Sequence, residues 1–349
     1  MKILHSNPTI TENDIQAVTD VLNSRHLEDG EIVEQFENKL KTYIGREYAV
    51  ATTNGFSAIH LSLIALGVME NDEVIIPSYT CPALLNPVLI MGAKPVFADI
   101  EYDSFNISAE QVKKKISEKT KAIIVPHTFG FPADIEAIAS LGYPVIEDCA
   151  QSLGGEFNGK KLGTSSEISI FSFYATKMMT SGDGGMVMTN NQDIYEKVLN
   201  YRYYGHRKNH KWIAYNYHLT NLPAALGISQ LENLDEWVGK RKKLSKIYDH
   251  YFRENSRINI NFENKMQSIY FRYPIKVEQR NQLKEELKKA DIYTGYGVLE
   301  GLHQLQDYPD KEYPNTAKFL EQILSLPIYP SLNESDIKFI AKKVLNIIK

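Results

Sequence analysis

The chain has 349 residues, 43% of them hydrophobic and 23% charged, which is the composition of an ordinary globular protein with room for a large and a smaller domain. Its net charge of -4 gives no electrostatic reason to bind nucleic acid. Cys81 and Cys149 stand in unrelated contexts and the histidines are scattered, so the sequence predicts neither a disulfide framework nor a metal site. We recognise no signal peptide and no apolar run near the roughly 20 residues of a membrane helix, and therefore expect a soluble, cytoplasmic protein.

Helical and strand patterns alternate over the first two thirds of the chain. The first helix is expected over Glu12–Ser24, where Val18 and Val21 share an apolar face. Short apolar runs typical of strands buried on both faces follow at Tyr48–Thr52, Glu73–Ile76, Lys94–Ala98, Ala122–Pro126, Val145–Glu147, Ile168–Phe173 and Gly185–Thr189. Helices are expected at Val33–Tyr43, Ala58–Leu66, Pro82–Met91, Ser108–Ile116 and Ile135–Ser140. This order predicts an α/β fold with a mostly parallel central sheet.

The pattern changes near Asp235. A long helix is expected over Asn221–Trp237, and the charged run Lys240–Lys243 after it is typical of a solvated helix face. The remainder predicts a strand at Ile269–Ile275 and helices at Gln279–Ala290, Thr316–Ser325 and Glu334–Ile348. We therefore expect a large domain over residues 1–235 and a small α+β domain over residues 236–349.

Lys177 follows an apolar strand and precedes a glycine-rich turn in the segment Phe171–Gly185. A surface lysine would be the ordinary interpretation. The apolar flanks favour an enclosed position instead, and burial favours the neutral amine that a Schiff-base lysine needs. From local sequence alone both interpretations stay open.

Two further segments have the character of ligand-binding elements. Glu147 and Asp148 end a buried strand, where ligand sites of such sheets lie, although a solvated strand end would look the same. The turn Thr53–Ala58 joins a strand to a helix, and its backbone amides would face an anion, although an ordinary helix cap would have this sequence too. Together with Lys177 these segments supply a phosphate cradle, a carboxylate and a covalent lysine in that order.

The order and spacing of these segments resemble the DegT/DnrJ/EryC1/StrS family of sugar aminotransferases, which have the fold-type I architecture of enzymes that use pyridoxal 5'-phosphate (PLP). The resemblance covers nearly the whole chain, from Ser24–Gly30 to the ending Leu324–Pro330. It implies that Lys177 carries PLP as a Schiff base and that Asp148 pairs with the pyridine nitrogen. It also implies roles for other residues that contact the cofactor: Gln151 near the phenolic oxygen, Ser172 and the turn of Gly55, Phe56 and Ser57 at the phosphate, and Asn216 reaching the phosphate from a partner subunit of a homodimer.

Some positions depart from the family pattern. Phe56 replaces a residue that usually has a hydroxyl group, so backbone amides and Ser57 would carry more of the phosphate binding. Cys81 stands where many members have an aromatic residue that stacks on the PLP ring. His218 replaces an arginine, and the segment Tyr203–Tyr215 is short. These departures concern cofactor packing and substrate choice rather than Lys177 or Asp148.

The resemblance implies transfer of an amino group from L-glutamate to a keto-sugar, most often nucleotide-linked, for glycan or antibiotic-type sugar biosynthesis. A transaminase of a cyclitol or another small keto compound stays open as an alternative. A PLP sugar dehydratase is disfavoured because those relatives have histidine in place of the cofactor lysine, and a non-catalytic sensor is disfavoured by the intact set of cofactor residues. His303 is a candidate substrate contact or a packing residue, and His218 is a further candidate contact. Tyr329 is a third candidate contact, for which a structural role is the preferred interpretation.

Overall fold

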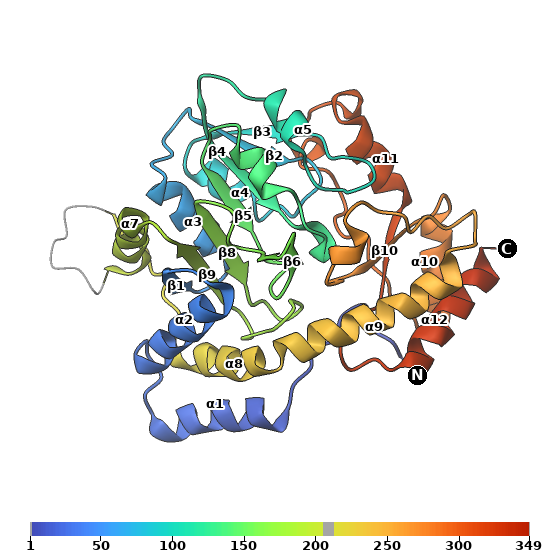
Figure 1. The fold of residues 1–349 in the computed structure, drawn as a ribbon, viewed down its shortest axis with the longest axis horizontal. Coiled ribbons are helices and arrows are strands. Elements are labelled where there is room, and N and C mark those ends of the chain that lie inside the picture. Colours follow the sequence, from blue (N-terminus) through green and yellow to red (C-terminus); the bar gives the residue numbers. More distant parts are fainter. Residues whose placement is uncertain (1, 205–212, 349) are drawn as a thin grey trace.

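The computed structural model describes residues 2–204 and 213–348, and a seven-stranded sheet forms its centre (Figure 1). The strands lie in the order β1-β9-β8-β5-β4-β2-β3. They are β1 (Tyr48–Thr52), β2 (Glu73–Pro77), β3 (Lys94–Ala98), β4 (Thr120–Pro126), β5 (Val145–Asp148), β8 (Ile168–Ser172) and β9 (Gly185–Thr189). All neighbouring pairs are parallel except those of β9, which runs antiparallel to both β1 and β8. The mostly parallel α/β sheet that the sequence predicts is confirmed.

Helices cover both faces of this sheet because its strands alternate apolar side chains between two cores. Val50 of β1 packs in one core with α3, α4 and α7, whereas Ala49 and Ala51 pack in the other core with α2 and α8. The helices of this part are α1 (Glu12–Ser24), α2 (Glu31–Ile44), α3 (Gly55–Ala65), α4 (Leu85–Ile90), α5 (Ala109–Lys113), α6 (Ile135–Ala139), α7 (Gln192–Arg202), α8 (Asn221–Glu232) and α9 (Leu234–Phe252). A small hairpin of β6 (Glu156–Phe157) and β7 (Lys160–Lys161) lies between β5 and β8 in sequence.

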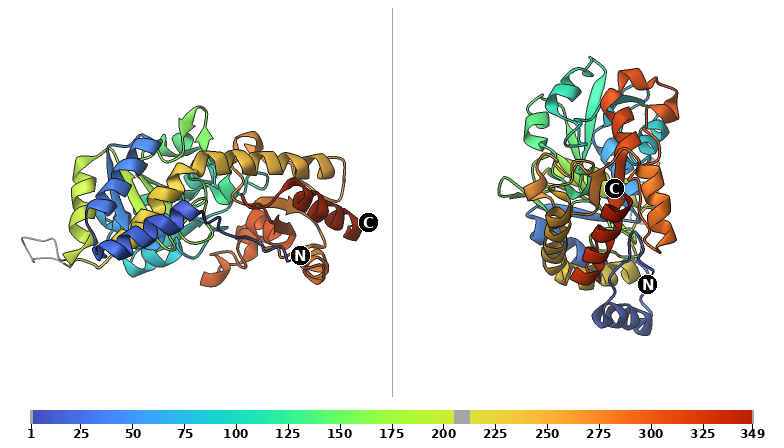
Figure 2. Two further views of the ribbon diagram at one scale, coloured as in Figure 1. Left: turned by 90° about the horizontal axis from the view of Figure 1, so that it is seen from below. Right: turned by 90° about the vertical axis from the view of Figure 1, so that its right-hand side faces the viewer.

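Helix α9 leads from the central sheet to a second group of elements (Figures 1 and 2). These are the antiparallel pair β10 (Tyr273–Lys276) and β11 (Ile323–Leu326), with α10 (Arg280–Lys289), α11 (Pro314–Gln322) and α12 (Glu334–Ile347). The amino-terminal segment joins this group, since Ile3 forms a parallel bridge with Ile292. A division of the chain at residue 235 stays a prediction. None of the helices in residues 2–204 and 213–348 combines the length and apolarity that a membrane span requires.

Three expectations for the chain after Asn221 were wrong in detail. The long helix over Asn221–Trp237 is two helices, because a turn at Asn233 separates α8 from α9. The run Lys240–Lys243 is not uniformly solvated, since Arg241 is buried and binds backbone carbonyls of the small group. The expected helix over Thr316–Ser325 ends at Gln322, and the residues that follow pair with β10 as a strand.

Candidate active site

The ends of β1, β5 and β8 and the start of β9 meet at one edge of the sheet. Gly185 pairs with Thr52 on one side and with Ser172 on the other, so these three residues lie side by side. Asp148 ends β5, which is the other neighbour of β8. The carboxyl ends of strands in such sheets are where ligands bind.

Three hydrogen bonds at the N-cap of α3 hold the turn between β1 and α3. The Asn54 side chain accepts hydrogen bonds from the backbone N–H of Ser57 at 2.8 Å and from its hydroxyl at 2.9 Å, and Thr53 shares a third bond with that hydroxyl at 3.0 Å. The Ser57 hydroxyl is therefore engaged in the cap. Phe56, which is partly buried, can offer only its backbone N–H.

Gly55 brings this turn against β8. A side-chain carbon at Gly55 would lie 2.9 Å from the Cβ atom of Ser172, closer than the packing allows. The absence of a side chain thus places the amino terminus of α3 beside the Ser172 hydroxyl. Backbone N–H groups of a helix amino terminus together with a hydroxyl make a suitable cradle for a phosphate.

Lys177 and Asp148 influence each other electrostatically across this edge. Lys177 lies in the turn after β8 and is partly buried, with its Nζ atom 5.5 Å from the centre of the Phe271 ring. Burial lowers the pKa of Lys177, and the Asp148 carboxylate opposes this by raising it. Asp148 is buried, and one of its oxygens accepts a hydrogen bond from the backbone N–H of Ala150 at 2.8 Å. Burial raises the pKa of Asp148, while the bond from Ala150 and the charge of Lys177 lower it.

Gln151 follows Asp148 by three residues in the turn after β5, and Cys81 lies near Lys177. The side-chain oxygen of Gln151 accepts a hydrogen bond from the backbone N–H of Phe129 at 2.7 Å, so its amide nitrogen is the atom that can donate to a ligand. Cys81 is exposed, and its thiol lies close enough to raise the pKa of Lys177. Both positions are consistent with contacts to a molecule bound at Lys177.

Asn216 and His218 lie on the strip that follows the undescribed residues 205–212. Asn216 is exposed and bridges Tyr203, whereas His218 bridges Thr52 and packs on the Tyr203 ring with centroids 3.9 Å apart. Most of the segment Tyr203–Tyr215, whose shortness suggested a change in substrate choice, lies outside the described residues. Asn216 is exposed in the single chain, and its expected contact with the cofactor of a partner subunit stays a prediction.

His303 is a packing residue in this structure. It is fully buried, its Nδ1 atom shares a hydrogen bond with the Ser78 hydroxyl, and its Nε2 atom lies 2.9 Å from a carboxylate oxygen of Asp310. The ring also stacks on Tyr313 at 4.4 Å. Because both ring nitrogens have protein partners, the geometry favours packing over substrate contact. Tyr329 is likewise buried in the core of the small group, as its structural interpretation requires.

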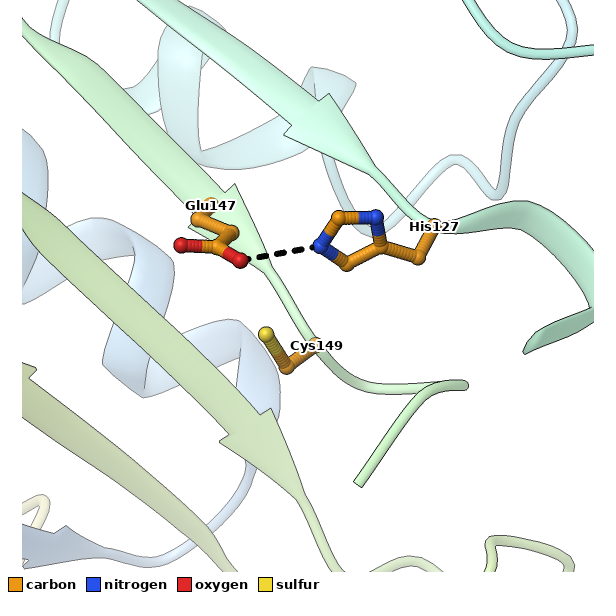
Figure 3. Close-up of side chains that lie close together, drawn as sticks. All are labelled: His127, Glu147 and Cys149. Carbon is orange, nitrogen blue, oxygen red and sulfur yellow. Dashed lines mark hydrogen bonds and ion pairs between the residues drawn. The ribbon is translucent and has the colours of Figure 1, made fainter. Parts of the chain in front are cut away.

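Next to Asp148, three titratable side chains form a buried cluster (Figure 3). The Nδ1 atom of His127 accepts a hydrogen bond from the backbone N–H of Ala133 at 2.9 Å, so Nε2 carries the proton that points at Glu147 at 3.0 Å. Glu147 also accepts hydrogen bonds from the backbone N–H of Gly163 and from the Ser166 hydroxyl. Burial raises the pKa of Glu147, but these bonds outweigh burial and the net effect is a lowered pKa.

The third member of the cluster, Cys149, keeps its proton because burial raises the pKa of its thiol. Both nitrogens of His127 are engaged, so the cluster has the chemistry of a structural hydrogen-bond network rather than of a metal centre. Its effect is to fix the end of β5. The backbone N–H of His127 donates to the Asp148 carbonyl at 3.2 Å, which holds the backbone of the candidate catalytic carboxylate.

Several site residues were missed by the sequence analysis. A small pocket beside Lys177 is lined by residues 6–9 of the amino-terminal segment and by Arg241. Phe271 and Arg272 approach Lys177 from the segment just before β10. An arginine within the apolar run Ile269–Ile275 was the signal that could have identified Arg272, because an unexplained charge among buried residues points to a function.

Comparison with known proteins places the chain in a family. Residues 8–345 match the model of the DegT/DnrJ/EryC1/StrS aminotransferase family. The chain belongs to this family. It is 34% identical to GDP-perosamine synthase of Escherichia coli O157:H7, with 97% of this chain and 96% of that protein covered. The fold, the family and the aminotransferase class expected from the sequence are confirmed.

Solved structures extend this comparison. The putative sugar aminotransferase Spr1654 of Streptococcus pneumoniae, in its PLP-form, superposes with a TM-score of 0.93 at 25% identity, covering 100% of this chain and 99% of that chain. PseC of Helicobacter pylori, an aminotransferase involved in the biosynthesis of pseudoaminic acid, has a TM-score of 0.92 at 28% identity, covering 100% of this chain and 99% of that chain. The PLP-form of Spr1654 shows that this relative binds PLP.

The residues of this chain fit PLP. Gly55 has no side chain and lies directly against Ser172, so the cradle can offer the backbone N–H groups of the α3 amino terminus and the Ser172 hydroxyl to a phosphate. Asp148 has one carboxylate oxygen engaged by Ala150 and no protein partner among the described residues on the other. Lys177 supplies an amine whose pKa is lowered by burial. The three groups a PLP site needs are therefore present at one edge of the sheet.

Proposed function

We propose that this protein is a PLP-dependent aminotransferase that moves an amino group from L-glutamate to a nucleotide-linked keto-sugar. The observation that carries the proposal is the meeting of Lys177, Asp148 and the Gly55 cradle at the carboxyl ends of the strands. The sugar substrate is supported by the relatives, since GDP-perosamine synthase and PseC belong to sugar biosynthesis. L-Glutamate as donor rests on the resemblance to the family.

Bound PLP would supply an electron-withdrawing ring that stabilises negative charge on the carbon from which a proton is removed. Lys177 would hold the cofactor and, once released, move a proton between the substrate carbon and the cofactor carbon as base and acid. Asp148 would keep the ring nitrogen protonated, and its burial strengthens that charged hydrogen bond. Gln151 would donate its amide to the phenolic oxygen, because its carbonyl oxygen is already engaged by Phe129.

A homodimer with shared sites belongs to the proposal. Asn216 is exposed at the rim of the region next to Thr52 and the cradle, where a residue of a second molecule could be met. In such a dimer Asn216 of one subunit would contact the cofactor phosphate bound by the other. Cys81, exposed in the single chain, would be covered by the bound cofactor.

The test is the visible absorbance of the purified protein and its response to L-glutamate. We expect an absorbance band that borohydride abolishes with formation of a stable adduct on Lys177, located by peptide mass spectrometry. Glutamate should bleach the band and yield 2-oxoglutarate, and a panel of nucleotide keto-sugars should restore it. A Lys177→Ala variant that still forms the reducible adduct at its normal place would refute the assignment of the cofactor lysine. A response to cyclitol ketones alone would show that the acceptor is a cyclitol ketone and not a keto-sugar.

A further inference from the structure

The strip that carries Asn216, residues 215–218, runs between the end of α7 and the turn that opens α3. The backbone N–H of Tyr217 donates to the Arg202 carbonyl at 2.8 Å, and the Tyr217 carbonyl accepts a hydrogen bond from the backbone N–H of Thr53 at 2.8 Å. Thr53 belongs to the turn that forms the candidate phosphate cradle. The strip is therefore fastened directly beside the cradle of its own subunit.

The side chains of this strip point alternately to two sides, as they do in any extended chain. Tyr215 and Tyr217 lie on one side, where their rings stack with centroids 4.9 Å apart and an interplanar angle of 7°. His218 lies on the other side, against the Tyr203 ring. Alternation places Asn216 on this second side too, and it is exposed there. Whatever holds the two tyrosines therefore also decides where Asn216 points.

His60 of α3 holds the tyrosine side of the strip. Its Nδ1 atom shares a hydrogen bond with the Tyr217 hydroxyl at 3.2 Å, and its ring meets the Tyr215 ring edge-on at 4.9 Å. His60 is 1% exposed, and burial lowers its pKa, so the imidazole is neutral at neutral pH. Burial raises the pKa of Tyr217, so the hydroxyl keeps its proton. A neutral ring and a protonated hydroxyl thus share this hydrogen bond.

Packing alone does not explain a histidine at this position. The Nε2 atom of His60 is buried and has no hydrogen-bond partner among the described residues, which costs free energy. A leucine would fill a similar volume in the apolar core around α3 without that cost. The polar contact that the imidazole adds is the one between Nδ1 and Tyr217. The contribution of the histidine is therefore its bond to the strip.

We propose that His60 and Tyr217 are positioning residues that hold Asn216 where it contacts the cofactor phosphate bound by the partner subunit, an inference that rests on the proposed aminotransferase function and its homodimer. Helix α3 then serves two sites at once. Its amino terminus at Gly55 faces the phosphate of its own subunit. Its second turn, at His60, sets the strip for the phosphate of the other subunit.

Tyr217→Phe tests this inference because it removes the hydroxyl and keeps the ring. PLP is titrated into the cofactor-free homodimer and followed by the Schiff-base absorbance, in parallel with pyridoxal, which has no phosphate. We expect Tyr217→Phe to weaken PLP binding roughly 3- to 10-fold, the range for one hydrogen bond, and to leave pyridoxal binding unchanged. In an Asn216→Ala background the same substitution should weaken PLP no further, since its effect passes through Asn216.

Tyr102→Phe is the matched control. It also removes one hydroxyl that is bonded to a side chain, here Gln322 at 2.5 Å in the second group of elements, and it should bind PLP as wild type does. His60→Leu is the second variant, which removes the other partner of the same bond. It should produce the same phosphate-specific loss, again absent in the Asn216→Ala background.

Heterodimers locate the effect in the site of the partner. Where one subunit carries Lys177→Ala, only the intact subunit can form the Schiff base. Tyr217→Phe placed in the Lys177→Ala subunit should weaken PLP binding at the intact site, whereas Tyr217→Phe placed in the intact subunit should not. The reverse pattern would show that Tyr217 acts on the cradle of its own subunit, and would refute the inference.

The remaining outcomes separate this inference from the function on which it rests. If Asn216→Ala weakens PLP binding and neither Tyr217→Phe nor His60→Leu does, the positioning role is refuted and the aminotransferase function stands. The same conclusion follows if either substitution weakens PLP equally with and without Asn216. If Asn216→Ala binds PLP as wild type does, the inference fails together with the shared site. If wild type forms no Schiff-base absorbance with added PLP, the aminotransferase function itself fails.

Discussion

At the scale of single residues, the site depends on charges that the protein holds out of water. Asp148 is buried and would remain ionised only with a cationic partner, which Lys177 supplies in the free protein and a protonated ring nitrogen would supply in the loaded one. The neighbouring network of His127 and Glu147 is satisfied internally and adds rigidity without competing for ligands. Arg241 and Arg272 are buried cations of this region that form no ion pair with an acid of the described residues, and both donate to backbone carbonyls instead.

The lowered pKa of Lys177 predicts how fast the cofactor-free protein captures PLP as pH varies. Capture requires the unprotonated amine, so the rate should rise through a midpoint below the value of about 10.4 for an ordinary lysine. Asp148 raises the pKa of Lys177, so Asp148→Asn should move the midpoint to still lower pH. Stopped-flow absorbance over a pH series measures it. A midpoint that stays in place or moves upward in Asp148→Asn would show that the two side chains are not coupled.

At the scale of elements, the site depends on the close approach of helix α3 to strand β8. Gly55 begins the helix with no space for a side chain, and Gly185 at the start of β9 would collide with the Asn54 carbonyl, at 2.3 Å, if it had one. Three elements from distant parts of the sequence therefore meet through small residues. This contact positions the backbone N–H groups of α3 for a phosphate.

Gly55→Ala should weaken both the fold and cofactor binding. The added carbon would lie 2.9 Å from the Cβ atom of Ser172, so α3 must shift away from β8; we expect a loss of about 1–3 kcal/mol in the free energy of unfolding and roughly tenfold weaker PLP binding. Gly239→Ala is the matched control, since Gly239 lies in α9 with nothing within 4 Å of an added carbon. That change should stabilise the protein by up to about 1 kcal/mol. Denaturant unfolding and PLP titration of both variants measure the difference, and equal behaviour of the two would contradict the packing argument.

At the scale of the whole molecule, the candidate site is assembled from two groups of elements. The central sheet supplies Lys177, Asp148 and the cradle, while the segment before β10 supplies Phe271 and Arg272. Helix α9 joins the two groups, and its Arg241 binds three carbonyls of the second group. A movement between the groups would therefore change the distance between Arg272 and Lys177, which both lie near the Phe271 ring.

The proposed homodimer predicts complementation between inactive subunits. In a heterodimer of Lys177→Ala and Asn216→Ala subunits, one site carries both defects and the other site carries neither. Such heterodimers, purified through two different affinity tags, should recover about half of the wild-type activity with L-glutamate, although each homodimer is impaired. Recovery no greater than the mean of the two homodimers would place Asn216 in the site of its own subunit or outside any site.

The sequence by itself determined the chemistry of the centre. Continuous apolar runs separated by helical patterns predicted the parallel sheet, because strands buried on both faces need apolar residues at every position. Lys177, Asp148 and the Gly55 turn were found because each stands at a strand end, which local patterns mark well. The family match over residues 8–345 agrees with the resemblance that these segments suggested.

Only the tertiary structure decided which charges are enclosed and which polar groups are already engaged. Arg241 and the rest of Lys240–Lys243 look alike as a charged run, yet Arg241 is buried because three carbonyls from other segments accept its hydrogen bonds. His303 was equally suited to substrate contact or packing until Ser78 and Asp310 were found on its two nitrogens. Arg272 likewise lies in an apolar run, and only the structure shows that it is buried without an ion pair to an acid of the described residues, because partners distant in sequence are set by packing rather than by local pattern.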